Sequence, residues 1–291
     1  MERKKYLRKP EWLKIKLPDA IEASRVVRML DEKHLNTICT SGMCPNRGEC
    51  WGAGTATFMI CGAICTRNCK FCNVDHGRPL PLDPAEPNKI AQSVAHLKLK
   101  HAVLTSVDRD DLPDLGAAHW AATVRAIKEM TPDVTIETLI PDFQGRTELI
   151  DQVIEAGPDV ISHNLETVRR LTPAVRSAAT YERSLKVLRH IAQSGTRAKT
   201  GIMLGLGETP EEVEQTIQDT VDAGVEVMTI GQYLQPTDDN YPIQAYIHPD
   251  QFAEYARIGR EKGLAHIESS PLVRSSYHAH LHVRKRAHEN D

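Results

Sequence analysis

The sequence predicts an α/β fold, a partial (β/α)6 TIM-like barrel with an N-terminal cysteine-rich extension and a C-terminal extension. Two observations predict this architecture. Six short apolar runs alternate with longer amphipathic stretches, and polar motifs follow the ends of the apolar runs. Such alternation implies parallel strands that are joined by right-handed crossovers. Because a closed TIM barrel has about eight units, six units form either an open barrel or a doubly wound sheet.

The individual elements follow one another along the chain. A first helical stretch is expected at Pro18–Glu32, ahead of the sheet. The strands are predicted at Ala56–Cys61, Ala102–Ser106, Val134–Leu139, Val160–Asn164, Ala198–Leu204 and Val227–Tyr233. The helices are predicted near residues 88–98, 117–130, 147–156, 180–194, 209–223 and 249–262. The predicted divisions are an N-terminal extension that carries cysteines (1–54), the partial barrel (55–264) and a C-terminal extension (265–291).

Composition argues against several classes of function. The chain has 291 residues and is 41% hydrophobic, which suffices for one large domain. The net charge of −3 argues against broad nucleic-acid binding. No apolar run reaches the roughly 18 residues that a membrane-spanning helix needs. The basic N-terminus lacks the apolar segment of a secretory signal, so we expect a cytoplasmic protein.

Cysteine usage is the first unusual feature. All seven cysteines lie between Cys39 and Cys72. A secreted disulfide framework would distribute its cysteines along the chain and would not need so large a body. A dense cysteine segment in a large intracellular protein more often indicates metal or redox chemistry.

The second cysteine triplet has the spacing Cys65-x3-Cys69-x2-Cys72. Three thiolates on one short loop can hold three irons of a cubane cluster and leave the fourth iron open for a ligand. The zinc alternative uses four ligands in paired spacings, and only one such pair is present here. A disulfide within the triplet is the less favoured alternative.

The remaining four cysteines divide into a triplet and a single residue. Cys39, Cys44 and Cys50 are widely spaced around Pro and Gly residues, which suits a loop that wraps a second cluster. That cluster also lacks one protein ligand, which must come from elsewhere in the chain. Cys61 ends an apolar run, so we interpret it as a buried thiol in preference to a metal ligand.

These motifs resemble those of a known family. The Cys-x3-Cys-x2-Cys loop after the first strand is similar to the signature of radical S-adenosylmethionine (SAM) enzymes. With the first triplet and RSSYHA at 274–279, the chain resembles the lipoyl synthases over nearly its whole length. The segments that carry the resemblance are TATFMI, CTRNCKFC, TSVDRDDLPDLGA, ETLIPDFQG, HNLETV, KTGIMLGLGET, GQYLQPT and PLVRSSYHA, in that order.

The resemblance implies two [4Fe-4S] clusters and SAM as cofactors. One cluster, on Cys65, Cys69 and Cys72, would bind SAM and cleave it to a radical that removes hydrogen from an octanoyl-lysyl group on a carrier domain. The auxiliary cluster, on Cys39, Cys44 and Cys50, would supply sulfur at C6 and C8 to form the lipoyl group.

The resemblance also implies a serine of the RSSY motif as the fourth ligand of the auxiliary cluster. We assign this role to Ser276, with Ser275 as the less favoured choice. A serine oxygen is a harder and weaker ligand for iron than a thiolate. We therefore infer that this ligand suits a cluster that must open to release sulfur.

Further residues are candidates for contact with SAM, on the strength of the resemblance and of their places in or after strands. They are Thr105, Ser106, Asn164, Glu166, Lys199, Gly205 and Glu208. For Asn164 and Glu166 the open alternative is a solvent-facing polar pair at a strand end. For Lys199 it is a residue that only covers a barrel rim. Gly205 and Gly207 alone are a weak dinucleotide signal.

Other polar residues have simpler interpretations. Asp108 to Asp111 are predicted to be a solvated charge cluster. Thr209 is predicted to cap the next helix, with Pro210 at its first position. Arg274 either positions the auxiliary cluster or a carboxylate, or forms a structural salt bridge. His278 and His280 are predicted to be surface residues and not metal ligands.

The resemblance also implies partners. These are octanoylated lipoyl carrier domains (2-oxoacid dehydrogenase E2 subunits or the glycine cleavage H protein), an electron donor such as ferredoxin or flavodoxin, and an iron–sulfur carrier that rebuilds the cluster. Neither a nucleic acid nor a membrane is expected as a partner. Cys61 and Ala63 stand where the family has Leu and often Asp, which leaves a divergent paralogue with another substrate partner open.

Two other functions compete with this one. A radical SAM enzyme that modifies a nucleic-acid base would carry an added basic RNA-binding domain and would not need RSSY. A non-enzymatic iron–sulfur or zinc carrier would not need the long β/α body that follows the cysteines.

Overall fold

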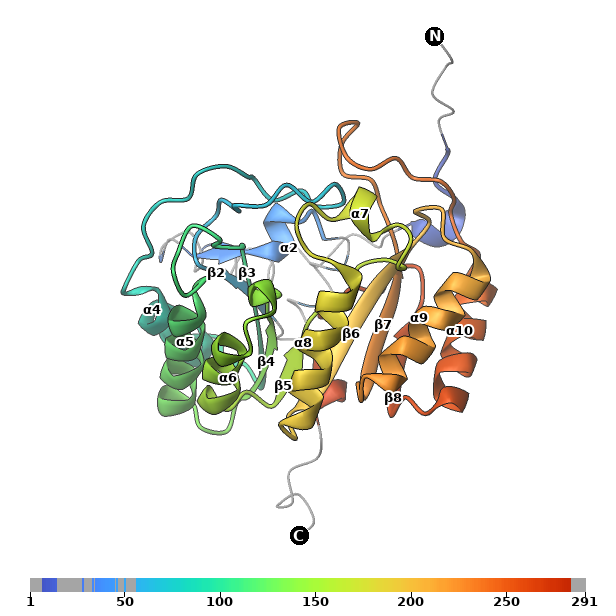
Figure 1. Cartoon of the computed structure of the whole chain (residues 1–291). Helices are drawn as coiled ribbons and strands as arrows, with labels where there is room; N and C mark the ends of the chain where they lie inside the picture. Colours follow the sequence, from blue (N-terminus) through green and yellow to red (C-terminus); the bar gives the residue numbers. More distant parts are fainter. Residues whose placement is uncertain are drawn as a thin grey trace.

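The computed structural model describes residues 7–14, 28, 33, 35–44, 46, 50 and 56–283. Its centre is one eight-stranded sheet in which the strands lie side by side in chain order (Figure 1). The strands are β1 (Asn36–Thr37), β2 (Ala56–Ile60), β3 (His101–Ser106), β4 (Thr135–Leu139), β5 (Val160–Ser162), β6 (Arg197–Leu204), β7 (Val227–Gln232) and β8 (His266–Ser269). β1 pairs antiparallel with β2, and every later pair is parallel.

This strand order confirms the predicted partial barrel. A doubly wound sheet reverses its strand order at a switch point, whereas here each strand pairs with its neighbour in sequence. β1 and β8 end the order, and no strand pairing joins them among the described residues, so the barrel is open. Its long helices are α4 (Glu86–His96), α5 (Ala117–Met130), α6 (Thr147–Ala156), α8 (Tyr181–Gln193), α9 (Pro210–Asp222) and α10 (Pro249–Lys262).

Each long helix follows one of the strands β2 to β7, which gives the six predicted β/α units. In Figure 1 these helices flank the strands, and α2 (Ile38–Ser41) and α7 (Thr172–Val175) lie beyond one end of the sheet. Three short 3-10 helices complete the described elements: η1 (Glu11–Leu13), η2 (Phe143–Gly145) and η3 (Ala279–His282).

Local sequence signals explain where the helices begin and end. Thr209 and Glu212 form a capping box at the start of α9, with Pro210 at its first position, as predicted. α6 and α10 end at Gly157 and Gly263, both in the left-handed region that glycine adopts without a steric penalty.

The strands β2 to β7 correspond to the six apolar runs that the sequence shows. β7 is buried at every position, as expected of a parallel strand that is covered on both faces. β8 was not predicted, because its sequence HIES contains a single apolar residue and gives no strand signal. β8 extends the sheet into the segment that we had assigned to the C-terminal extension. The helix predicted at Pro18–Glu32 lies outside the described residues, apart from Arg28.

None of the helices that the structure describes combines the length and the apolarity needed to cross a bilayer.

The capping box of α9 gives a first test of this description. Thr209 Oγ accepts a hydrogen bond from the Glu212 backbone, and the Glu212 carboxylate accepts one from the Thr209 backbone at 2.9 Å. We expect Thr209→Ala to lower the free energy of unfolding by about 1 kcal/mol. Denaturant unfolding followed by circular dichroism measures this, with Thr209→Ser, which keeps the hydroxyl, as the control. An unchanged midpoint for Thr209→Ala would show that the box is not stabilising.

Candidate active site

A pocket lies at the C-terminal ends of the barrel strands, where parallel β/α folds place their functional groups. It gathers side chains from the cysteine loop, from the segments that follow β3, β4 and β5, and from the C-terminal segment. Seven of the predicted site residues line it: Cys65, Cys69, Cys72, Thr105, Ser106, Asn164 and Glu166. Ser275 also lines the pocket, next to Ser276, the serine that we preferred as the cluster ligand.

The loop from Cys65 to Cys72 directs backbone N–H groups at its sulfur atoms. The amides of Arg67 and Asp108 donate to Cys65 Sγ at 3.4 and 3.3 Å. The amide of Val74 donates to Cys72 Sγ at 3.4 Å. N–H groups that point at cysteine sulfur stabilise the thiolate and adjust the potential of a bound cluster.

The cysteines are buried or half-buried, and none forms a disulfide, so the disulfide alternative has no support. Burial raises the pKa of Cys65 to about 12 and that of Cys72 to about 11, and the nearby Asp108 carboxyl also raises the former. Thiols in such surroundings ionise when a metal binds them, since a coordinated thiol is deprotonated outright. This donor set therefore fits an iron–sulfur cluster.

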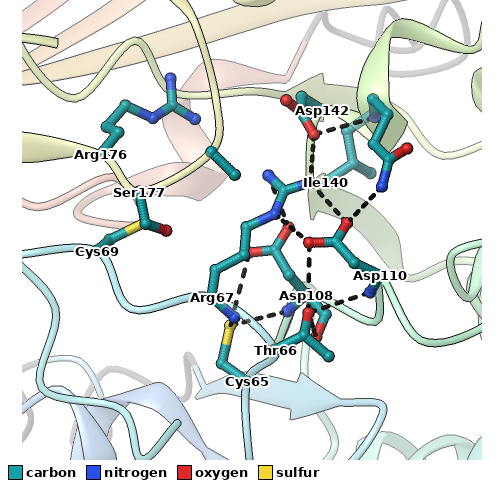
Figure 2. A network of polar contacts seen from close by, with 12 residues as sticks. Cys65, Thr66, Arg67, Cys69, Asp108, Asp110, Ile140, Asp142, Arg176 and Ser177 are labelled. Atoms are coloured by element: carbon teal, nitrogen blue, oxygen red, sulfur yellow. Dashed lines mark hydrogen bonds and ion pairs between the residues drawn. The ribbon is translucent and has the colours of Figure 1, made fainter. Parts of the chain in front are cut away.

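Arg67 sits between the first two cysteines of the loop and forms the centre of a charged network (Figure 2). Its guanidinium lies 3.2 Å from Asp108, 2.7 Å from Asp110 and 2.8 Å from Asp142. The first two aspartates follow β3, and Asp142 follows β4. The side chain of Arg67 is 5% exposed and that of Asp142 is fully buried. One side chain of the cysteine loop thus fixes the loop to the ends of two strands.

This network corrects the interpretation of Asp108 to Asp111 as a solvated charge cluster, which is wrong. Asp108 and Asp110 bind Arg67, and Asp111 pairs with Arg109 at 2.9 Å. Arg109 is itself buried and donates to the carbonyl of Cys61 at 3.1 Å. The pattern DRDD alone did not reveal these pairings, because the arginine that binds two of its aspartates is about 40 residues earlier.

The carboxyls of the network differ in their titration. Burial opposes ionisation of Asp142, but Arg67 outweighs it and holds the pKa of Asp142 well below its usual range. Burial raises the pKa of Asp108, and Arg67 offsets this only in part. Asp108 Oδ2 lies 3.7 Å from Cys65 Sγ, so the least acidic carboxyl of the group faces the sulfur.

Asn164 and Glu166 form the wall of the pocket beyond β5. The Asn164 side-chain oxygen is buried and makes no hydrogen bond with any residue that the structure describes. Glu166 adopts a left-handed backbone (φ 67°) and pairs with β6 through Gly201 and Met203. A buried acceptor without a partner costs free energy unless a ligand satisfies it. The wall therefore fits a ligand that presents N–H or O–H donors, as SAM does.

Three other predicted cofactor contacts do not line the pocket. Lys199 is fully buried, pairs with Glu137 at 2.6 Å and does not line the pocket. Glu208 accepts hydrogen bonds from the amides of Gly205 and Leu206 in the loop after β6. A Cβ on Gly205 would lie 2.3 Å from the carbonyl of Ala245, so only glycine fits. These three residues shape the barrel and its loop, and their contact with SAM stays a prediction.

The first cysteine triplet is attached to both the second triplet and the C-terminal segment. The Asn46 side chain donates to the Leu272 carbonyl at 2.7 Å, and the Asn73 side chain donates to Ser41 at 2.8 Å. Burial lowers the pKa of Arg274, and the charge of the Cys44 thiol opposes this shift. Arg274 makes no salt bridge with a described residue, which favours the cluster-positioning alternative.

Cys61 lies apart from both triplets. It is 1% exposed, and its backbone amide donates to Glu86 at 2.8 Å. Burial, together with the Glu86 carboxylate, raises the pKa of this thiol. The prediction of a buried thiol is confirmed.

The network around Arg67 yields the second prediction. Arg67→Met leaves three carboxyls without their shared cation, which costs roughly 3 kcal/mol of stability for a buried ion pair. We expect the variant to lose most of the iron held by Cys65, Cys69 and Cys72, as counted by iron and sulfide analysis and by the electron paramagnetic resonance of the reduced cluster. Arg146→Met is the matched control, since Arg146 is 43% exposed and contacts Glu148 and the Pro113 carbonyl at the surface. Wild-type iron content in Arg67→Met would contradict this role.

Comparison with known proteins supports the same assignment. The model of the radical SAM superfamily matches residues 59–220. The chain is 61% identical to a lipoyl synthase of Bacteroides fragilis over 96% of this chain and 97% of that protein. It is 62% identical to a lipoyl synthase of Treponema denticola over 95% of each chain.

Solved structures agree at the level of the fold. The FeFe-hydrogenase maturase HydG from Carboxydothermus hydrogenoformans matches with a TM-score of 0.59 and 12% identity, over 90% of this chain and 77% of that one. Methylornithine synthase matches with a TM-score of 0.54 and 12% identity, over 81% and 76%. Taken with the sequence matches and the pocket of three cysteines, these findings establish that the chain belongs to the radical SAM superfamily and, within it, to the lipoyl synthase family.

Proposed function

We propose that this protein inserts two sulfur atoms, at C6 and C8, into an octanoyl-lysyl group on a carrier domain and so forms the lipoyl group. One observation carries the proposal. The chain aligns with lipoyl synthases at about 60% identity over nearly its whole length. In the structure the cysteine loop and Ser275 line one pocket at one end of the barrel, and hydrogen bonds from the Asn46 and Asn73 side chains attach the first triplet there. The substrate is thus an octanoylated protein.

Two [4Fe-4S] clusters and SAM, when bound, supply the one-electron chemistry that reaches an unactivated C–H bond and the sulfur that replaces the hydrogen. The protein contributes placement and exclusion of side reactions. Cys65, Cys69 and Cys72 hold the first cluster, and backbone amides stabilise two of their sulfurs.

The walls of the pocket orient the cofactor and keep water away. The unpartnered Asn164 oxygen accepts from an amino or hydroxyl group of SAM, and Glu166 beside it accepts a second donor. Four apolar residues line the same pocket: Phe71, Val74, Leu139 and Ile140. This apolar part of the lining accommodates the aliphatic chain of the substrate.

The auxiliary cluster is the second of the two, and it is held by the first cysteine triplet, Cys39, Cys44 and Cys50. In our assignment Ser276 is its fourth ligand. Arg274 interacts electrostatically with Cys44 and offers positive charge to a set of anionic thiolates. Ser275 lines the main pocket, which makes it the alternative ligand or a contact of the substrate. Exchange of a serine oxygen at iron is easier than exchange of a thiolate, which suits a cluster that gives up sulfur.

The proposal extends to partners and location. The carrier domain is that of a 2-oxoacid dehydrogenase E2 subunit or of the glycine cleavage H protein, ferredoxin or flavodoxin supplies electrons, and an iron–sulfur carrier rebuilds the second cluster. Seven cysteines without a disulfide suit the reducing cytoplasm. We retain the division into the N-terminal extension, barrel and C-terminal extension, with β8 as the last strand of the barrel sheet.

The decisive experiment uses the enzyme reconstituted anaerobically with iron and sulfide. Incubation with SAM, a reductant and an octanoyl-lysyl peptide should give a peptide whose mass reports two inserted sulfurs. Cleavage of SAM without sulfur in the peptide would reduce the assignment to radical SAM chemistry on another substrate.

The serine assignment gives the third prediction. We expect Ser276→Ala to keep SAM cleavage but to lose sulfur insertion by at least about 100-fold, because the second cluster lacks its fourth ligand. Ser276→Cys should form product more slowly than wild type, because a thiolate is harder to displace. Ser275→Ala, one residue away, is the matched control and should keep most of the activity.

The same measurements separate the two serines. Loss of insertion in Ser275→Ala with full activity in Ser276→Ala would move the ligand to Ser275. Unchanged product formation by Ser276→Cys would contradict the argument that this ligand must be labile.

A further inference from the structure

A separate group of side chains that could bind a metal ion lies at the opposite end of the barrel from the active site. His266 begins β8 and pairs in register with Val227, the first residue of β7. Lys199, near the start of β6, lies at the same level, because it also pairs with Val227. The C-terminal segment reaches this level too, since η3 packs against β3 and places His282 in the interior with no exposed surface.

Three side chains converge there with metal-ligand spacing. His266, Glu268 and His282 each offer one ligand atom, and these atoms lie within 4.8 Å of one another. His266 and Glu268 are two positions apart on β8, so they project from the same face of the strand. The imidazole rings of His266 and His282 have centroids 4.7 Å apart.

The hydrogen bonding of this cluster is incomplete. The Nε2 atoms of His266 and His282 are buried, and neither makes a hydrogen bond with any residue of the described chain. Nε2 of His266 lies 3.5 Å from Glu268 Oε2, which is too long for an N–H···O bond. Two ligands of one tetrahedral zinc ion stand about 3.4 Å apart when each bond is about 2.1 Å. The spacing thus matches two ligands of a shared ion.

Neighbouring residues hold the ligands in place. Nδ1 of His282 lies 2.9 Å from Nζ of Lys199, so an ion on Nε2 requires a ring that carries its proton on Nδ1 and donates it to an uncharged Lys199 amine. Glu137 contacts Lys199 at 2.6 Å and takes up the proton that this amine gives up. Nδ1 of His278 lies 3.5 Å from Oε1 of Glu268, which leaves the second oxygen toward His266. Such partners behind the ligands are usual in metal sites.

We propose that His266, Glu268 and His282 bind one Zn²⁺ ion, with a water molecule in the fourth position. Two imidazoles and a carboxylate form a set that zinc accepts. Two ligands come from β8 and one from η3, so the ion joins the C-terminal segment to the barrel. The same segment carries Arg274 to Ser276 at its other end, and zinc therefore limits the movement of the serines beside the active site.

The sequence interpretation had considered other histidines of this segment. His280 is exposed, in agreement with its prediction as a surface residue, and His278 is half-buried beside Glu268. The ligand from this segment is His282, which the alternating histidines did not identify because only the fold brings it to β8.

Metal analysis of the holoenzyme tests the site. The protein is produced with zinc in the medium, without a polyhistidine tag, and purified anaerobically, and its zinc and iron are counted by mass spectrometry. We expect one zinc per chain in wild type, in addition to the cluster iron. His282→Gln and Glu268→Gln should retain less than about a tenth of it, and His280→Gln, the matched control, should retain all of it.

X-ray absorption at the zinc edge of the wild-type protein identifies the ligands without reliance on any variant. Nitrogen and oxygen neighbours at about 2.0–2.1 Å support the site, whereas sulfur neighbours at about 2.3 Å would place the zinc on a cysteine triplet and overturn it. Absence of zinc from wild type, or equal zinc in His282→Gln, would also overturn it, with water then filling the space.

The zinc count is independent of catalysis. If the enzyme binds zinc here but makes no lipoyl group, the zinc site is supported and only the proposed function is contradicted. The joining role has its own readout: hydrogen exchange of residues 270–283 should quicken in His282→Gln and not in His280→Gln. Equal exchange in both variants would show that the ion does not restrain the segment.

Discussion

The active site depends on one buried guanidinium. Arg67 is the only residue of the loop Cys65–Cys72 that reaches three carboxylates, and these come from the ends of two adjacent strands. The loop packs on the core through Phe71 and the Cys65 side chain, and the contacts of Arg67 add buried charge pairs to this packing. Figure 2 shows these charge–charge contacts converging on the one side chain. Because Asp108 also donates its amide to Cys65 sulfur, the same contacts orient a cluster ligand.

Because the barrel is open, the C-terminal segment can pack against the sheet and contribute residues to the active site. After β8 the chain approaches β7 so closely that a Cβ on Gly231 would lie 2.1 Å from the Val273 carbonyl. A residue larger than glycine would displace the segment just before Arg274 and the two serines. From there the chain continues to η3, where His282 and Ala279 are fully buried. The segment thus supplies residues to the active site at one end and a buried anchor at the other.

The sequence predicted what depends on local pattern and missed what depends on distant pairing. Apolar runs revealed the strands β2 to β7, and the cysteine spacings revealed the loop that lines the pocket. The Arg67 network was missed because its members are separated by about 40 to 75 residues and each is an ordinary charged residue alone. β8 was missed because three of its four residues are polar.

Lys199 illustrates a further limit. The family resemblance suggested that it contacts the cofactor, in a strand predicted at Ala198–Leu204. Yet it stands five residues before the end of β6, which at about 3.3 Å per residue is roughly 16 Å below the rim. Depth along a strand decides which side chains reach the pocket. The predicted strand already placed Lys199 near its start, so the depth of a residue in its strand has to be weighed against a family resemblance before the residue is assigned to a site.

The architecture also separates a permanent part from a part that changes during turnover. The barrel rests on long strands and helices, whereas the described elements of residues 35–44 are a two-residue strand and a four-residue helix. The tie between this region and the C-terminal segment, from Asn46 to Leu272, joins residues 226 positions apart. In the proposed assignment, the ligands of the auxiliary cluster come from both ends of the chain, and among the described residues of the N-terminal region only the short β1 pairs with the sheet. In the proposed reaction that cluster is consumed, and a barrel whose stability lies elsewhere stays folded when it is lost.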